Sequence, residues 1–121
     1  MTHVPVTTGE GWTHQEELDS LTLWARGRQR AVEIGTWTGR SALAIAQGID
    51  PIAGRLWCVD HFQGSREEVF EECKTSQGRY RLLRTWMDRL APYAHDGRVK
   101  LLEIESWDGV QIVRKELRGK F

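Results

Sequence analysis

The sequence predicts an α/β fold, a Rossmann-like parallel sheet with flanking helices that is truncated to about three strands. Three short apolar runs, at residues 30–34, 55–59 and 99–104, alternate with longer segments in which apolar residues recur at helical spacing. The turn after the first run carries two glycines, and an acidic residue follows the second run. Strands that alternate with helices pair in parallel, because each helix returns the chain to the starting edge of the sheet.

The first expected helix covers residues 13–26. Thr13 and Glu16 have the spacing of a capping box, which satisfies backbone N–H groups at a helix start. Apolar residues follow at helical spacing: Leu18, Leu21 and Trp24. They predict an amphipathic helix that ends near Gly27.

The first two strands flank an alanine-rich helix. The strands are expected at Arg30–Ile34 and Arg55–Val59, and the helix at residues 39–47. Gly48 follows the helix directly, and glycine is common just past a helix end. The loop 51–54 then leads into the second strand.

Two helical segments are expected between the second and third strands. Ser65 and Glu68 have the spacing of another capping box, and the helix that they open places three residues on one face: Val69, Phe70 and Cys73. Gly78 should interrupt this helix. A second amphipathic stripe should then end near Pro92: Leu83, Trp86, Met87 and Leu90. The charges of residues 66–89 are mixed in sign and indicate a solvated helical face.

A third strand and a last helix complete the pattern. The strand is expected at Val99–Ile104. Ser106 can cap the helix that follows, and Gly119 should end it. The residues expected to face inward are Val110, Val113 and Leu117.

The turn after the first strand points to a nucleoside-binding site. It reads Gly35-Thr-Trp-Thr-Gly39, it follows Glu33 closely, and it leads into a helix. Asp60 ends the second strand. Open parallel sheets bind ligands at the carboxyl ends of their strands, where an acid can accept both ribose hydroxyls. The glycines would let the backbone approach such a ligand.

The spacing of the turn argues against a dinucleotide. A dinucleotide site needs G-x-G-x-x-G, so that the pyrophosphate can sit on the helix N-terminus. Trp37 stands where the middle glycine belongs, and its indole would obstruct the pyrophosphate. Glu33 would repel phosphate but would suit a cationic amino group. S-adenosylmethionine has such a group and no phosphate.

The pattern E-I-G-x-x-x-G-x-S, followed by V-D-x-F-x-G-S, resembles that of class I S-adenosylmethionine-dependent methyltransferases. It is most similar to the small-molecule O-methyltransferase-like branch, and the resemblance runs from about Trp12 to the C-terminus. The resemblance implies S-adenosylmethionine as cofactor, a small-molecule acceptor and a strand order of 3-2-1. In that order the first strand lies at an open edge.

The resemblance also implies roles for particular residues. Glu33 would lie near the methionyl amino group, the backbone of Gly35–Gly39 under the methionine moiety, and Asp60 on the ribose. Trp107 and Asp108 would lie beside the adenine, although Asp108 could equally interact with the dipole of the last helix. The implied cofactor-binding residues are Glu33, Gly35, Thr36, Trp37, Gly39, Ser41, Asp60, His61, Trp107 and Asp108.

Several of these residues could instead have a purely structural role. Gly35 and Gly39 could simply form a tight turn between strand and helix. Glu33 could cap a helix or make a salt bridge, and Trp37 could pack against the N-terminal helix. His61 could be an exposed loop histidine rather than a base.

The length of the chain sets a further expectation. At 121 residues it suits one small domain, whereas the family carries a seven-stranded sheet. The acid-bearing D-x-x-F-I-D segment of the fourth strand is absent. We therefore interpret residues 1–121 as a single partial domain, the donor-binding half, with the catalytic base or metal ligands beyond Phe121. The open edge at residues 31–34 would be covered by self-association or by further polypeptide.

Composition excludes several classes. Seventeen basic and seventeen acidic residues give no net charge, so no electrostatic footprint for nucleic acid is present. Cys58 and Cys73 lack C-x-x-C spacing, which indicates reduced thiols and a cytoplasmic protein. Neither a signal peptide nor an apolar run of about 20 residues is visible, so no membrane association is expected. His3, His14 and His95 lack the spacing of a metal site.

Two other functions compete with methyl transfer. One is a non-catalytic protein, either a nucleoside-binding remnant or a subunit that completes its sheet with a partner. The other keeps the Rossmann-like fold but binds a nicotinamide cofactor, against which Trp37 and the missing third glycine argue.

Overall fold

The computed structural model describes residues 14–62 and 74–117. Along these residues the elements are α1 (Gln15–Ala25), β1 (Arg30–Ile34), α2 (Arg40–Gly48), β2 (Arg55–Val59), α3 (Ser76–Ala94), β3 (Val99–Leu102) and α4 (Ser106–Leu117). The three strands form one parallel sheet in the order β1-β2-β3. The predicted fold class and strand order are therefore confirmed. No helix within the described ranges is long and apolar enough to cross a membrane.

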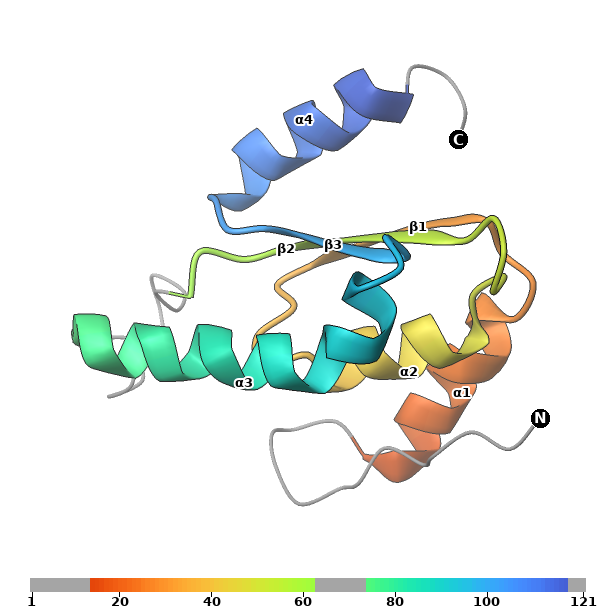
Figure 1. The fold of residues 1–121 in the computed structure, drawn as a ribbon, viewed down its shortest axis with the longest axis horizontal. Coiled ribbons are helices and arrows are strands. Elements are labelled where there is room, and N and C mark those ends of the chain that lie inside the picture. The colour runs from red at the N-terminus through yellow and green to blue at the C-terminus, as the bar shows by residue number, and fades with distance from the viewer. Residues whose placement is uncertain (1–13, 63–73, 118–121) are drawn as a thin grey trace.

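Helices cover the two faces of the sheet unequally (Figure 1). α1, α2 and α3 lie on one face, and α4 lies alone on the other. The main core fills the space between the sheet and the three helices, and its buried members are Ala25, Ala31, Ala42, Ile45, Ala46, Ile49, Leu56, Cys58, Phe62, Leu82, Trp86, Leu90 and Val99. A smaller cluster lies under α4 and consists of Trp57, Val113 and Leu117. The sheet thus has one well-covered face and one partly covered face.

Polar contacts fix α4 on its face of the sheet. Glu116 accepts hydrogen bonds from the Trp57 Nε1 of β2 and the Lys100 Nζ of β3, each at 2.9 Å. The bonds from Lys100 and Trp57 hold the pKa of the Glu116 carboxyl below its ordinary value. One carboxylate at the end of α4 therefore binds two neighbouring strands.

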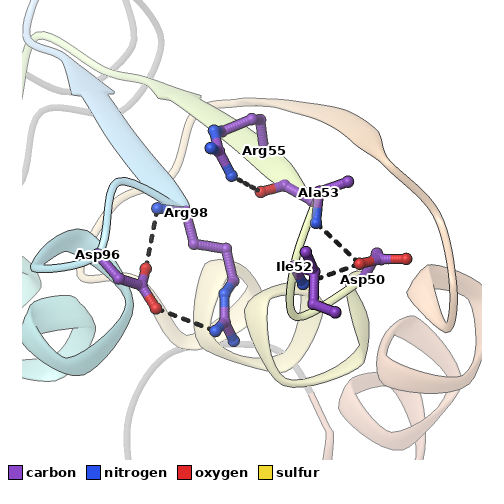
Figure 2. Close-up of polar contacts among 7 residues, drawn as sticks. Asp50, Ile52, Ala53, Arg55, Asp96 and Arg98 are labelled. Atoms are coloured by element: carbon purple, nitrogen blue, oxygen red, sulfur yellow. Dashed lines mark hydrogen bonds and ion pairs between the residues drawn. The ribbon is translucent and has the colours of Figure 1, made fainter.

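The loops that lead from α2 into β2 and from α3 into β3 contain local polar contacts at the amino ends of these strands (Figure 2). Asp50 Oδ1 accepts from the backbone N–H groups of Ile52 and Ala53, at 2.8 and 2.9 Å. These bonds lower the pKa of the Asp50 carboxyl, with that of Ala53 contributing most. Arg98 donates to Asp96 through both its backbone and its guanidinium, each at 3.0 Å. The candidate site lies at the opposite end of the sheet.

The helix boundaries correct two expectations. α1 begins at Gln15 with His14 as its N-cap, later than a capping box on Thr13 requires, and Thr13 lies outside the described residues. Gly78 does not interrupt a helix, because it lies in the first turn of α3. Thr75 Oγ1 accepts from the Gly78 N–H at 2.9 Å and so caps the helix there.

The end of α3 and the end of β3 also differ from the prediction. α3 continues past Pro92 to Ala94, because a proline in the last turn removes only one backbone hydrogen bond. β3 ends at Leu102 rather than Ile104, since β2 ends at Val59 and offers no partner further on. The expected capping box and apolar face at residues 65–73, and the stop at Gly119, lie outside the described residues.

Two large side chains of the expected apolar helix stripes, Trp24 and Met87, are exposed rather than in the core. Trp24 is 49% exposed, and the Arg28 guanidinium lies over its ring at 4.5 Å from the centroid. Met87 is 51% exposed, because the inward face of α3 passes through Leu82, Trp86 and Leu90 instead. On α4 the buried positions are Gly109, Val113 and Leu117, whereas Val110 is only half-buried.

Candidate functional site

The turn between β1 and α2 lies at the carboxyl end of the sheet. Gly35 and Thr36 donate their backbone N–H groups to the Val59 carbonyl of β2, at 2.8 and 3.3 Å. Gly39 donates to the Thr36 carbonyl at 2.9 Å and closes the turn. The turn is therefore anchored on the end of the neighbouring strand, beside Asp60.

Asp60 organises the backbone on both sides of the site. Its Oδ2 accepts from the Trp37 N–H at 2.7 Å, and its Oδ1 accepts from the Phe62 N–H at 2.9 Å. Trp37 and Phe62 have φ angles of 50° and 59°, in the left-handed region that bulky residues rarely adopt. The carboxylate thus stabilises two unfavourable backbone conformations. Each oxygen keeps a second lone pair with which it could accept a ligand hydroxyl.

The two glycines of the turn have different environments. Both have positive φ, +77° at Gly35 and +88° at Gly39. A Cβ on Gly35 would meet nothing within 4 Å, so that backbone faces open space. A Cβ on Gly39 would lie 2.6 Å from Leu90 Cδ2 and 2.9 Å from Trp86 Cδ1. Gly39 is therefore required by the close packing of α3, and only Gly35 presents open backbone of the kind expected for both.

Glu33 carries the most perturbed carboxyl of the site. It pairs in register with Cys58 of β2, and its Oε1 is buried without a hydrogen-bond partner among the described residues. Burial raises the pKa of Glu33 to about 7, a hydrogen bond with the Thr36 side chain lowers it in part, and the charge of Asp60 raises it further. An unsatisfied buried carboxylate oxygen favours either a proton or a cationic ligand group.

A buried polar cluster lies beneath the turn. Thr36 is only 3% exposed, and its Oγ1 accepts from the Trp86 Nε1 of α3 at 2.9 Å. Burial raises the pKa of the Cys58 thiol far above its ordinary value, so this cysteine is kept protonated. Cys58 thus behaves as a core residue rather than as a nucleophile.

The remaining predicted residues follow strand ends or lie in the first turns of α2 and α4. His61 follows Asp60 and is half-buried, so it is not a freely exposed loop histidine. Ser41 lies in the first turn of α2 and is also half-buried. Trp107 and Asp108 are exposed in the first turn of α4, where Glu105 accepts from the Trp107 N–H at 3.1 Å and so takes the capping role expected of Ser106. No group of three or more His, Cys, Asp or Glu in the described ranges could hold a metal ion.

Two residues of α3 that contact the turn were not predicted. Arg89 NH1 donates to the Thr38 carbonyl at 2.9 Å and to its Oγ1 at 3.3 Å. Trp86 contacts Thr36 as described, and was expected only as a core residue. In the sequence Arg89 is one of many charges between residues 66 and 89. The available signal is its position three residues after Trp86, on a helix face that is otherwise apolar.

The fold and this edge define the class of the protein as a Rossmann-like α/β domain. A family model described as a methyltransferase domain matches residues 32–109, which is more than half of the chain. The chain therefore belongs to this methyltransferase family. No curated protein sequence matches the chain significantly.

Three solved structures share the fold. A proposed O-methyltransferase from Klebsiella pneumoniae has a TM-score of 0.60 and 18% identity over 88% of this chain and 40% of its own. Rv0187 from MTB, solved with its cofactor bound, has a TM-score of 0.53 and 19% identity over 75% of this chain and 34% of its own. The O-methyltransferase TomG from Streptomyces achromogenes, involved in tomaymycin synthesis and solved with SAM, has a TM-score of 0.51 and 23% identity over 74% of this chain and 33% of its own. The chain thus spans about a third to two fifths of the length of these proteins.

Proposed function

We propose that this chain is the donor-binding half of an S-adenosylmethionine-dependent methyltransferase that acts on a small-molecule acceptor. The observation that carries the proposal is the pair Glu33 and Asp60 at the carboxyl ends of adjacent parallel strands, beside a turn whose Gly35 backbone faces open space. The family assignment and the cofactor complexes of the fold neighbours support the same ligand class.

The chemistry of the edge fits S-adenosylmethionine. The buried Glu33 Oε1 lacks a partner among the described residues, and an amino group would supply both a donor and the opposite charge. Asp60 can accept ribose hydroxyls on the lone pairs that Trp37 and Phe62 leave available. Gly35 offers backbone that a ligand can approach. Trp37 occupies the position at which a dinucleotide site needs glycine.

Roles for the other predicted residues belong to the same proposal. We assign Thr36 and Gly39 to the turn under the methionine moiety, Ser41 and His61 to its border, and Trp107 with Asp108 to the adenine side. The bound cofactor would supply an activated methyl group on a sulfonium, so the chain would bind and orient the donor. The acceptor site and any proton-accepting group are assigned to the part of the longer fold neighbours that this chain does not cover.

The open edge of β1 extends the proposal to assembly. In the described part of the chain β1 pairs with β2 alone, and its Val32 and Ile34 are 36% and 47% exposed. Unpaired backbone groups beside exposed apolar side chains promote strand pairing with another chain. We infer that this edge is covered by self-association or by additional polypeptide.

Isothermal titration calorimetry of the 121-residue chain tests the proposal. S-adenosylhomocysteine, the demethylated product, should bind detectably, and NAD should bind more weakly or not at all. Glu33→Gln should weaken S-adenosylhomocysteine binding, whereas Glu103→Gln, which changes an exposed carboxylate after β3, should not. Preferential binding of NAD would instead support the nicotinamide reading, and absence of both would refute the donor-binding assignment.

A further inference from the structure

We propose that Trp86 and Arg89 of α3 are positioning residues that hold the donor-binding turn in its binding shape. The inference rests on the proposed function, because it concerns the turn to which donor binding is assigned. α3 lies far from the turn in sequence, and no part of the predicted binding motif includes it.

Each of the two side chains binds a different point of the turn. Trp86 Nε1 donates to Thr36 Oγ1 at 2.9 Å, in a buried environment. Arg89 NH1 donates to the Thr38 carbonyl at 2.9 Å and to the Thr38 hydroxyl at 3.3 Å. The contacts fall on either side of Trp37, so they hold the segment whose N–H binds Asp60.

The backbone of the turn needs such support. Trp37 holds a φ of 50°, which costs free energy for a large side chain and persists only where its surroundings enforce it. Asp60 supplies one restraint from the end of β2, and Trp86 and Arg89 of α3 supply two more. α3 can approach the turn closely enough to make these contacts because Gly39 has no Cβ. Atoms of Leu90 and Trp86 lie within 3 Å of the position that a Cβ would take.

These two contacts of α3 with the turn, called the clamp below, also lie close in sequence to the acidic residue of the site, Glu33. Thr36, which accepts from Trp86, has a side chain that lowers the pKa of the Glu33 carboxyl and partly offsets its burial. Trp86 therefore fixes the Thr36 hydroxyl, three residues after Glu33, and Arg89 fixes the turn backbone two residues later. Because a binding site must hold its groups within a narrow range of positions, loss of either contact should reduce donor affinity more than it reduces overall stability.

Four variants of the 121-residue chain test the proposal. Arg89→Met removes the donors and keeps the aliphatic stem, Arg89→Lys keeps the charge and one donor group, and Trp86→Phe removes the indole N–H while keeping an aromatic ring in the core. Arg81→Met is the matched control, because Arg81 lies exposed on the same helix. Urea unfolding of each variant establishes that it folds.

Two measurements are made on each folded variant. Amide hydrogen exchange at Trp37 and Gly39 reports the turn without any ligand, and calorimetry with S-adenosylhomocysteine reports donor affinity. Arg89→Met and Trp86→Phe should exchange these amides on the order of tenfold faster and bind S-adenosylhomocysteine about tenfold more weakly. Arg89→Lys should recover part of both effects, and Arg81→Met should match the wild-type chain.

The outcomes separate this inference from the proposed function. Unchanged exchange at the turn in Arg89→Met and Trp86→Phe would overturn the clamp, whatever the ligand result. Faster exchange with unchanged affinity would show that α3 restrains the turn without positioning it for the donor, and would also overturn the inference. If the wild-type chain binds no S-adenosylhomocysteine, the proposed function and the donor role of the clamp fail, while the exchange still decides whether α3 fixes the turn.

Discussion

Replacing Glu33 by glutamine should increase the stability of the folded chain at alkaline pH, contrary to the usual effect of a mutation in a buried site. Burial raises the pKa of Glu33 from 4.5 to about 7 in the folded chain. Because the folded-state pKa lies above the ordinary value, the protonated carboxyl contributes stability that is fully present below about pH 4.5. That contribution is lost as the pH rises to about 7, and the carboxylate must then be held charged in an apolar place.

The size of the effect follows from the same pKa values. A rise from 4.5 to about 7, at about 1.4 kcal/mol for each pH unit, corresponds to about 3 kcal/mol of stability lost at pH 8. Glutamine has nearly the same shape and no charge at either pH. Glu33→Gln should therefore gain about 2–3 kcal/mol relative to the wild-type chain between pH 5 and pH 8.

Urea unfolding followed by tryptophan fluorescence measures this difference. The wild-type chain, Glu33→Gln and the exposed control Glu103→Gln are compared at pH 5 and pH 8, so that titration of other groups cancels. Parallel pH dependences of the wild-type chain and Glu33→Gln would refute the interpretation of Glu33 as a buried, charge-penalised carboxyl. A gain in stability accompanied by weaker S-adenosylhomocysteine binding would mark Glu33 as a group kept for its ligand.

Three further predictions follow from the structure. Asp60→Ala should destabilise the ligand-free chain by about 2 kcal/mol, because two backbone N–H groups lose their acceptor; an unchanged urea midpoint with weaker ligand binding would show that Asp60 serves the ligand alone. Gly39→Ala should cost more stability than Gly35→Ala, which meets only the strain of a positive φ, about 1 kcal/mol; equal thermal shifts would contradict the packing of α3 on Gly39. The chain should self-associate with rising concentration in light scattering, and Ile34→Lys should reduce that association; a monomer at all concentrations would show that the β1 edge is protected in another way.

Local signals in the sequence predicted the sheet and the carboxyl edge of the site. Short apolar runs predict the positions of the strands without knowledge of the segments that pack on them. The positions of Glu33 and Asp60 then follow from where the strands end. The turn could also be predicted from the sequence, because glycines at residues 35 and 39 allow the positive φ angles that the structure shows. These features depend on residues close together in sequence.

The parts that could not be predicted depend on contacts between distant segments. The glycine spacing predicts that residue 39 must be glycine, but the close approach of Leu90 and Trp86 that requires it depends on α3, far away in sequence. The start of α3 was missed because Thr75 caps a helix that contains Gly78, and a glycine near a helix start is tolerated once the cap forms. Arg89 resembles the solvated charges around it until its contact with Thr38, far away in sequence, is known.

A titration of the isotope-labelled chain with S-adenosylhomocysteine, followed by two-dimensional amide NMR, shows whether the donor binds at the Glu33–Asp60 edge. We predict saturable shifts of the Gly35, Trp37 and Asp60 amides, with the amides of the Asp50 loop at the opposite end of the sheet unchanged. NAD at the same concentrations should leave all of these signals in place. Shifts confined to other residues, or equal shifts with both ligands, would contradict the assignment of the Glu33–Asp60 edge as a donor-binding site.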